Sequence, residues 1–179
     1  MKTIIIKPLC IWLTGLSGSG KTSIAKVLQL KLMDLGVACI HIDGDEVREL
    51  ISADLKFSKE DRIENARRIA HIGKLIYKNN FTPIISTISP YIVSRDYARS
   101  IFPAGSFIEV YVNASIEICK QRDPKKLYDE VASGAVKNFT GIDMPYELSD
   151  TFDIEINTDI LGIKESVDKV LNHINTNLS

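Results

Sequence analysis

Eight residues near the N-terminus constrain the fold of this chain more than any other stretch: Gly15-Leu16-Ser17-Gly18-Ser19-Gly20-Lys21-Thr22. They fit the pattern G-x-x-x-x-G-K-[ST]. An apolar run over residues 9–13 precedes them, and an amphipathic run over residues 23–35 follows them. A strand, a glycine-rich loop and a helix in this order form the setting of a phosphate-binding loop, or P-loop. The alternative is a Gly/Ser-rich turn with a helix N-cap, but a chance match is roughly a one-per-cent event in a chain of this size.

Each residue type in the loop has a chemical reason. The glycines leave room for triphosphate oxygens to approach backbone N–H groups, and they tolerate positive φ. A helix that starts near Gly20 directs its unpaired N–H groups and its dipole at the anion. Lys21 is expected to reach the β- and γ-phosphates, and the Thr22 hydroxyl is a hard oxygen ligand suited to Mg²⁺. The predicted ATP site therefore includes Gly15, Leu16, Ser17, Gly18, Ser19, Gly20, Lys21 and Thr22.

Composition favours one soluble α/β domain over residues 1–179. A hydrophobic content of 45% and a charged content of 25% are ordinary for a globular protein, and no linker divides the chain. A net charge of −1 gives no basic excess to hold a polyanion, so we expect no nucleic-acid partner. We also expect no membrane partner, because no apolar run approaches the ~20 residues that a span needs. Residues 1–8 are too short and too interrupted for a signal peptide.

The chain has three cysteines, Cys10, Cys39 and Cys119. Cys10 and Cys39 fall in apolar, strand-like runs, where a thiol behaves as a small hydrophobe. The count is odd and no CxxC occurs. We expect buried, reduced thiols and a cytoplasmic location.

Apolar, β-rich runs alternate with helical patterns along the chain. Strands are expected at residues 9–14, 38–42, 82–88, 107–112 and 154–157, and helices at residues 23–35, 59–77 and 163–174. Ser58, with Asp61 three residues later, is the expected N-cap of the second helix. The alternation indicates a buried parallel sheet of five strands with helices on both faces. Ligands gather at the carboxyl ends of such strands, so residues 15–22, 43–45, 86–90 and 113 are expected on one rim.

The stretch over residues 122–148 differs from the rest. It is polar, carries Asp123-Pro124 and two glycines, and shows no strand pattern. It is also long for a connection between elements. These features favour a functional lid over a disordered loop.

Two carboxylates, Asp43 and Asp45, follow the second expected strand with Gly44 between them. A kinase needs a carboxylate near the attacking hydroxyl, either to accept its proton or to hold Mg²⁺ through water. The alternative is that Asp43 or Asp45 caps a helix that starts near Glu46. We favour a functional role for the pair.

Arginines and aromatic side chains suggest a second ligand. Arg62 and Asn65 are three residues apart on the expected helix, so both can face one pocket, and Arg48 precedes them. A guanidinium group suits phosphate or sulfate oxygens, although a run of charges is usually a solvated face. Phe57 and Phe139 either belong to the core or clamp a flat base between them.

These motifs together make the chain resemble the adenylylsulfate kinase (APS kinase) family over about residues 9–160. The P-loop alone indicates only nucleotide binding, whereas the later motifs are specific. They are Asp43-Gly44-Asp45 with Arg48, Phe57-Ser58 with Asp61-Arg62, Ile88-Ser89-Pro90-Tyr91 with Arg95, Arg122-Asp123-Pro124-Lys125, and Lys137-Asn138-Phe139-Thr140-Gly141-Ile142-Asp143. The resemblance implies a three-layer P-loop kinase fold. It also implies transfer of phosphate from ATP to the 3′-hydroxyl of adenosine 5′-phosphosulfate (APS), with PAPS as the product.

The resemblance also assigns roles by position. Lys21 and Asp43 would be catalytic. Ser89 matches a serine once proposed as a phosphoenzyme site, although we favour direct in-line transfer. Arg122, Lys125 and Thr158 would contact ATP. The acceptor would contact Asp45, Arg48, Phe57, Arg62, Asn65, Ile88, Ser89, Lys137 and Phe139. Homodimers are common in the family.

The chain departs from the family pattern at three places. Lys56 and Lys126 stand where the family usually has glycine, and Leu148-Ser149 stands where prolines usually follow. One alternative is therefore a kinase with another activated nucleotide as acceptor, such as cytidine diphosphoramidate in surface-polysaccharide modification. A second alternative is a nucleotide-gated binding module, against which Lys21, Thr22, Asp43 and the lid argue.

Overall fold

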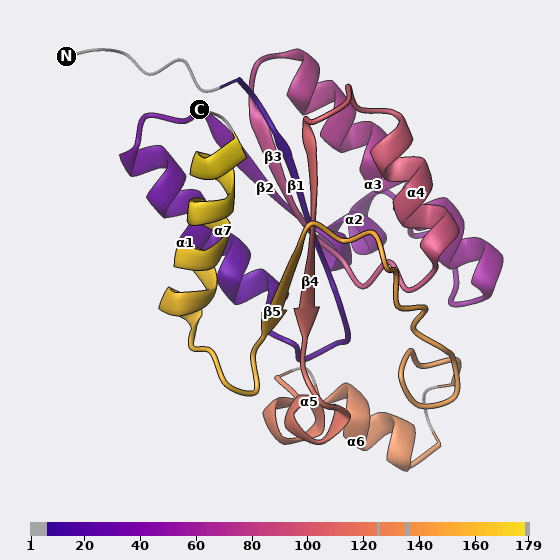
Figure 1. Cartoon of the computed structure of the whole chain (residues 1–179). Coiled ribbons are helices and arrows are strands. Elements are labelled where there is room, and N and C mark those ends of the chain that lie inside the picture. Colours follow the sequence, from indigo (N-terminus) through magenta and orange to yellow (C-terminus); the bar gives the residue numbers. More distant parts are fainter. Residues whose placement is uncertain (1–6, 125, 135–136, 178–179) are drawn as a thin grey trace.

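A computed structural model describes residues 7–124, 126–134 and 137–177. Its centre is a parallel sheet with the strand order β2-β3-β1-β4-β5 (Figure 1). The strands are β1 (Cys10–Thr14), β2 (Cys39–Asp43), β3 (Thr82–Ser86), β4 (Phe107–Asn113) and β5 (Ile154–Asn157). The prediction of five parallel strands is confirmed. The largest difference at a carboxyl end is in β3, which stops at Ser86 rather than at residue 88.

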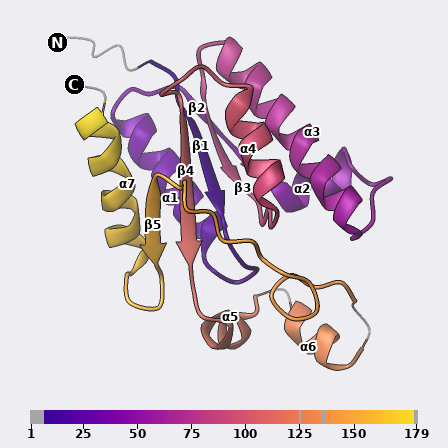
Figure 2. The same cartoon turned by 45° about the vertical axis from the view of Figure 1, so that its right-hand side comes forward.

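Helices cover both faces of the sheet, so the protein has three layers. One face carries α1 (Lys21–Asp34) and α7 (Ile163–Asn177), and the other carries α2 (Gly44–Leu50), α3 (Lys59–Lys78) and α4 (Ile92–Ser100) (Figure 1). Two short helices, α5 (Ile116–Arg122) and α6 (Leu127–Ala132), lie beyond the carboxyl ends of the strands (Figure 2). The predicted three-layer α/β fold is therefore confirmed. None of the described helices has the length and apolarity to cross a membrane.

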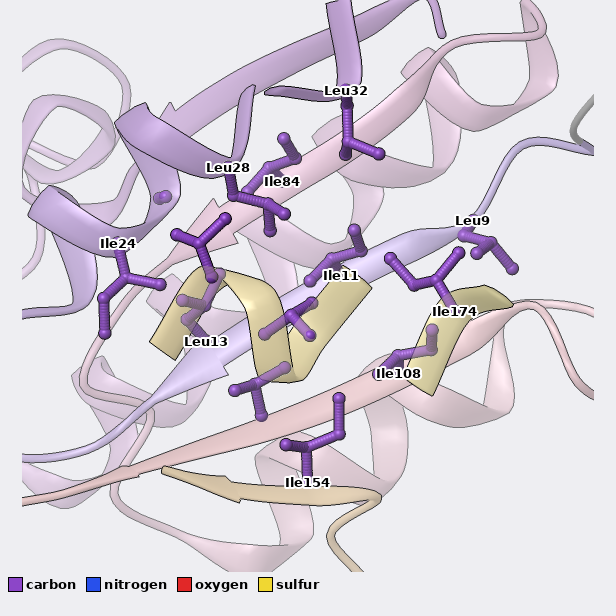
Figure 3. Packing of buried hydrophobic residues seen from close by; sticks show 14 of the residues in the cluster. Leu9, Ile11, Leu13, Ile24, Leu28, Leu32, Ile84, Ile108, Ile154 and Ile174 are labelled. Atoms are coloured by element: carbon purple, nitrogen blue, oxygen red, sulfur yellow. The ribbon is translucent and has the colours of Figure 1, made fainter. Parts of the chain in front are cut away.

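The central strand β1 is buried on both faces, which explains its continuous apolar sequence. Ile11 and Leu13 pack against α1 and α7 in the cluster that Figure 3 shows. Cys10 and Trp12 point to the opposite face, where Ile69 of α3 lies in the same cluster. All five residues of the strand have no exposed surface. A rigid central strand therefore holds the loop that follows it.

Helix α3 begins where its sequence predicts. Ser58 is the N-cap, and its Oγ accepts a hydrogen bond of 3.1 Å from the backbone N–H of Asp61. The inward face of the helix carries Ala66 and Ile69, but also Arg62 and Asn65, which are buried with them. A polar pair on the buried side of a helix points to a ligand site at that end.

The three cysteines are buried and free, as predicted. Burial is the main cause that raises the pKa of Cys10, Cys39 and Cys119 above that of an ordinary thiol. A raised pKa means little thiolate at neutral pH, so these groups act as packing side chains.

Candidate active site

A cavity of about 1020 Å³ opens at the carboxyl ends of the strands. It brings together most of the residues that the sequence predicts for both ligands. They are Ser17, Gly18, Gly20, Lys21, Thr22, Asp43, Asp45, Arg48, Phe57, Arg62, Asn65, Ile88, Ser89, Arg122, Lys137 and Phe139. Asn113, expected on the same rim, does not line it. Lys125 lies outside the described residues.

The P-loop depends on glycine at two points of close approach. A Cβ atom at Gly15 would lie 2.3 Å from the backbone oxygen of Val112, and one at Gly18 would lie 2.8 Å from that of Cys119. Gly20 is the N-cap of α1 and forms no side-chain cap, so the first turn of the helix keeps N–H groups for an anion. The Lys21 Nζ donates to the Leu16 oxygen over 2.6 Å.

Asp43 uses its two carboxylate oxygens for different partners. Oδ1 accepts a hydrogen bond of 2.9 Å from the backbone N–H of Asp45, and this bond caps α2. Oδ2 accepts from the Thr22 hydroxyl over 2.8 Å and from the Ser86 hydroxyl over 3.3 Å. The expectation that this helix starts near Glu46 was wrong, because it begins at Gly44, with Asp45 in its first turn. Capping by Asp43 therefore leaves Oδ2 beside the P-loop.

Two arginines of the cavity lining lie beside the exposed ring of Phe57. The guanidinium carbons of Arg48 and Arg62 are 5.1 Å and 5.5 Å from the ring centroid. Arg62 Nη2 donates to the Asn138 oxygen over 2.6 Å, and Arg48 Nη1 donates to the Lys56 oxygen over 2.7 Å. Burial lowers the pKa of both guanidinium groups, yet an arginine remains charged at neutral pH. This part of the cavity suits an anion beside a flat ring.

Two buried polar atoms in the cavity lining have no hydrogen-bond partner among the described residues. They are Asn65 Oδ1 and Thr140 Oγ1. Burying an unpaired polar atom is unfavourable, so these atoms are suited to a ligand. The sequence reasoning named Asn65 but missed Thr140, although Thr140 stands in a quoted motif.

The lid segment reaches back to the P-loop through an aromatic pair. Phe139 is buried and packs edge-on against Tyr128, with ring centroids 4.9 Å apart. The Tyr128 hydroxyl donates to the Ser17 oxygen over 2.9 Å. Lys126 has a left-handed backbone with φ of 55°, a conformation that glycine adopts more readily than other residues.

Arg122 and Thr158 meet at a second, smaller cavity of about 260 Å³. Arg122 Nη1 donates to the Thr158 hydroxyl over 3.1 Å, and that hydroxyl donates to the Ser19 oxygen over 2.9 Å. Leu161 and Ile163 supply apolar lining there. Residues of the lid, of the loop after β5 and of the P-loop therefore lie together at this smaller cavity.

The Ser89 hydroxyl is fully engaged inside the protein. It accepts from Trp12 Nε1 over 3.0 Å and donates to Thr14 Oγ1 over 3.0 Å. The Thr14 hydroxyl donates to the Ile88 oxygen, and the Tyr146 hydroxyl donates to Thr14 over 2.8 Å. These bonds assign the hydroxyl a structural role in the loop after β3, and the geometry gives no support to a phosphoenzyme.

A buried ion pair, missed by the sequence reasoning, supports the same loop. Arg95 Nε lies 2.9 Å from Glu109 Oε1, and both side chains are at most 2% exposed. Burial raises the pKa of Glu109, while Arg95 and Arg99 oppose that shift. Arg95 also donates to the backbone oxygens of Ser89 and Glu147. It thereby joins the loop after β3 to the end of the lid segment.

Comparison with known proteins agrees with this geometry. The family model for adenylylsulphate kinase matches residues 7–157. An adenylyl-sulfate kinase of Staphylococcus carnosus is 42% identical over 168 residues, which cover 94% of this chain and 84% of the relative. One of Rippkaea orientalis is 46% identical over 160 residues, covering 89% and 87% of the two chains.

Solved structures give the same result. The APS kinase CysC of Mycobacterium tuberculosis, solved in complex with AMPPNP and APS, superposes with a TM-score of 0.89 at 35% identity over 94% of this chain and 98% of that one. A gluconokinase of Sinorhizobium meliloti, at 16% identity and a TM-score of 0.63, shares the fold alone. The chain therefore belongs to the adenylylsulphate kinase family.

Proposed function

We propose that the protein transfers the γ-phosphoryl group of ATP to the 3′-hydroxyl of APS, which gives PAPS and ADP. One observation carries this proposal. A single cavity joins a P-loop and Asp43 at one part to two arginines and an exposed phenylalanine at another. A phosphate donor and an anionic nucleotide fit that arrangement, and the APS kinase of M. tuberculosis was solved with both kinds of ligand.

The donor side is proposed to bind ATP through residues 15–22. Backbone N–H groups at the start of α1 would bind the phosphates. Lys21 would exchange its hydrogen bond with the Leu16 oxygen for phosphate oxygens. The smaller cavity lined by Arg122, Thr158 and apolar side chains would bind the adenine of ATP.

The acceptor side is proposed to bind the phosphosulfate and the second adenine. Arg48 and Arg62 would donate to the anionic groups, since a guanidinium fork matches their oxygens. Phe57 offers an exposed ring for stacking, with 49% of its surface exposed. Asn65 and Thr140 would supply hydrogen bonds from their unpaired oxygen atoms.

The transfer is proposed to be direct. The acceptor 3′-oxygen forms the new bond to the γ-phosphorus, and the bond from that phosphorus to the β–γ bridging oxygen breaks, so ADP leaves. The hydroxyl proton goes to Asp43 Oδ2, the carboxylate oxygen that faces Thr22. Lid closure would exclude water, which otherwise competes as acceptor.

The residues fit Mg²⁺, which prefers oxygen ligands. The Thr22 hydroxyl and the Asp43 carboxylate lie 2.8 Å apart beside the P-loop. Thr22 would hold the ion directly, and Asp43 would hold it through water. When bound, the ion would neutralise charge on the phosphate oxygens.

An ADP-release assay with three acceptor conditions tests the proposal. The enzyme is incubated with ATP and APS, with ATP and cytidine diphosphoramidate, and with ATP alone. We expect ADP release that depends on APS. Turnover only with the cytidine nucleotide would reject APS as the acceptor, and ATP binding without turnover in any condition would favour a binding module.

The cytoplasmic location expected from the sequence stays a prediction, and so does the homodimer that the resemblance to the family suggests. Cell fractionation tests the first of them. Size-exclusion chromatography with light scattering tests the second.

A further inference from the structure

A histidine lies beside the candidate base on the same strand. His41 and Asp43 are two residues apart on β2, so their side chains share one face of the sheet. On the neighbouring strand β3, Ser86 is the register partner of Asp43. The His41 Nε2 atom lies 2.8 Å from Ser86 Oγ, and Ser86 Oγ donates to Asp43 Oδ2 over 3.3 Å. Three side chains on two strands thus form one line of hydrogen bonds.

The proton positions along this line follow from donor capacity. A serine hydroxyl has a single hydrogen, and here it is directed at Asp43. The Ser86 oxygen must therefore accept from His41, which requires a proton on Nε2.

The line ends on the carboxylate oxygen that the proposed reaction uses. Oδ1 of Asp43 is held by the cap of α2, whereas Oδ2 is held by Thr22 of α1 and Ser86 of β3. Ser86 is 2% exposed, but its hydroxyl can rotate about the Cβ–Oγ bond. A donor at His41 Nε2 fixes that rotation, because it occupies a lone pair of the oxygen.

We propose that His41 is a positioning residue for phosphoryl transfer: it keeps the Ser86 hydroxyl directed at Asp43 Oδ2, the oxygen that receives the acceptor proton. This inference rests on the proposed role of Asp43. His41 lines no part of the main cavity, so it acts through Ser86. A positioning role predicts an effect on turnover and little effect on ATP binding.

The test compares His41→Leu, His41→Gln and Ser86→Ala in the full-length enzyme. Leucine cannot donate, whereas the amide nitrogen of glutamine can replace Nε2. We expect His41→Leu and Ser86→Ala each to lower kcat about 3- to 10-fold, the range for loss of one hydrogen bond, with the KM for ATP within about twofold. His41→Gln should keep kcat within about twofold of the wild type.

A double variant separates positioning from general loss of stability. If His41 acts only through Ser86, His41→Leu combined with Ser86→Ala should be no slower than Ser86→Ala alone. If the fold-losses in kcat of the two single variants multiply in the double variant, the inference is overturned. A His41→Leu enzyme with unchanged kcat would overturn it as well. The inference would also be overturned if His41→Gln had a kcat as low as that of His41→Leu while the two variants had equal thermal stability.

Failure of the proposed function would look different. A wild-type enzyme without APS-dependent ADP release would reject the APS reaction. The variants would then be compared with whichever acceptor supports turnover. Loss of ATP binding in Ser86→Ala would overturn the positioning role while leaving the reaction itself in place.

Discussion

The two parts of the cavity are built in different ways. The phosphate-binding part of the proposed ATP side is built largely on the backbone of one contiguous stretch, residues 15–22, which follows a strand that has no exposed surface. The acceptor side is formed by side chains from α2, α3, the loop after β3 and the lid. A backbone site depends on the shape of one loop, whereas a side-chain site depends on the whole topology.

The difference extends to how each part is held. Close approach to Val112 and Cys119 leaves the P-loop little freedom at Gly15 and Gly18. The loop after β3, on the proposed acceptor side, is held instead by the Thr14 and Ser89 hydroxyls and by the Arg95 guanidinium. Substitutions on the ATP side should therefore act through backbone shape, and those on the acceptor side through single hydrogen bonds.

The largest effect is expected at Asp43, where the two parts meet. Asp43→Asn keeps an oxygen that can cap α2 but removes the base, so kcat should fall about 10²- to 10⁴-fold. ATP affinity and the thermal midpoint should change little. Asp43→Ala should lose the same activity and, in addition, about 1 kcal/mol of stability with the cap. Near-normal turnover by Asp43→Asn would show that the residue is only a cap.

A smaller effect is expected at Arg48, on the acceptor side. Arg48→Ala should raise the KM for the acceptor about 10- to 100-fold, as loss of charge-assisted hydrogen bonds predicts. The KM for ATP should stay within about twofold. Arg67→Ala is the matched control, because Arg67 pairs with Glu64 on the surface and lines neither of the two cavities described above. Equal changes in the KM for ATP and in the KM for the acceptor would contradict the proposal that the two parts of the cavity bind different ligands.

A backbone effect is expected at Gly15. Gly15→Ala places a Cβ atom against the Val112 oxygen, so the loop must shift and ATP should bind about tenfold more weakly. Gly36→Ala is the control: it also has a positive φ, of 81°, but nothing lies within 4 Å of its Cβ position. Calorimetric titration with ATP measures the dissociation constant of each variant. Normal ATP binding by Gly15→Ala would contradict the shape argument.

The smallest effect on activity is expected at Ser89. Ser89→Ala leaves the indole N–H of Trp12 buried without its partner, so the protein should lose about 1–3 kcal/mol of stability. Turnover should fall less than about tenfold, as for other positioning bonds. Thermal unfolding and kcat are measured together. Complete loss of activity with unchanged stability would instead favour the phosphoenzyme.

The sequence predicted the features that lie in contiguous stretches. The P-loop, the five strands and the cap at Ser58 depend on local pattern, and each was found within two residues of its expected bounds. The start of α2 was missed by two residues, because Asp43 and Asp45 are both good caps and only the strand end decides between them. The grouping of Arg48, Arg62 and Phe57 followed from their motifs rather than from physical reasoning.

Other features could not be predicted because they depend on tertiary packing. The ion-pair partner of Arg95 is Glu109 on β4, which is fourteen residues away and only 2% exposed. An arginine in a run of charges gives no sign of such burial. The Thr140 hydroxyl and the His41–Ser86 contact likewise arise only when the strands and the lid are assembled.

The hydrogen bond between Trp12 and Ser89 has a practical consequence. Trp12 is the single tryptophan of the chain, and no part of it is exposed. Its fluorescence therefore comes from one known place, and its polar atom touches the loop that is proposed to line the acceptor. The wild-type enzyme thus carries an intrinsic optical reporter, whose emission would register disturbance of that loop without an added dye.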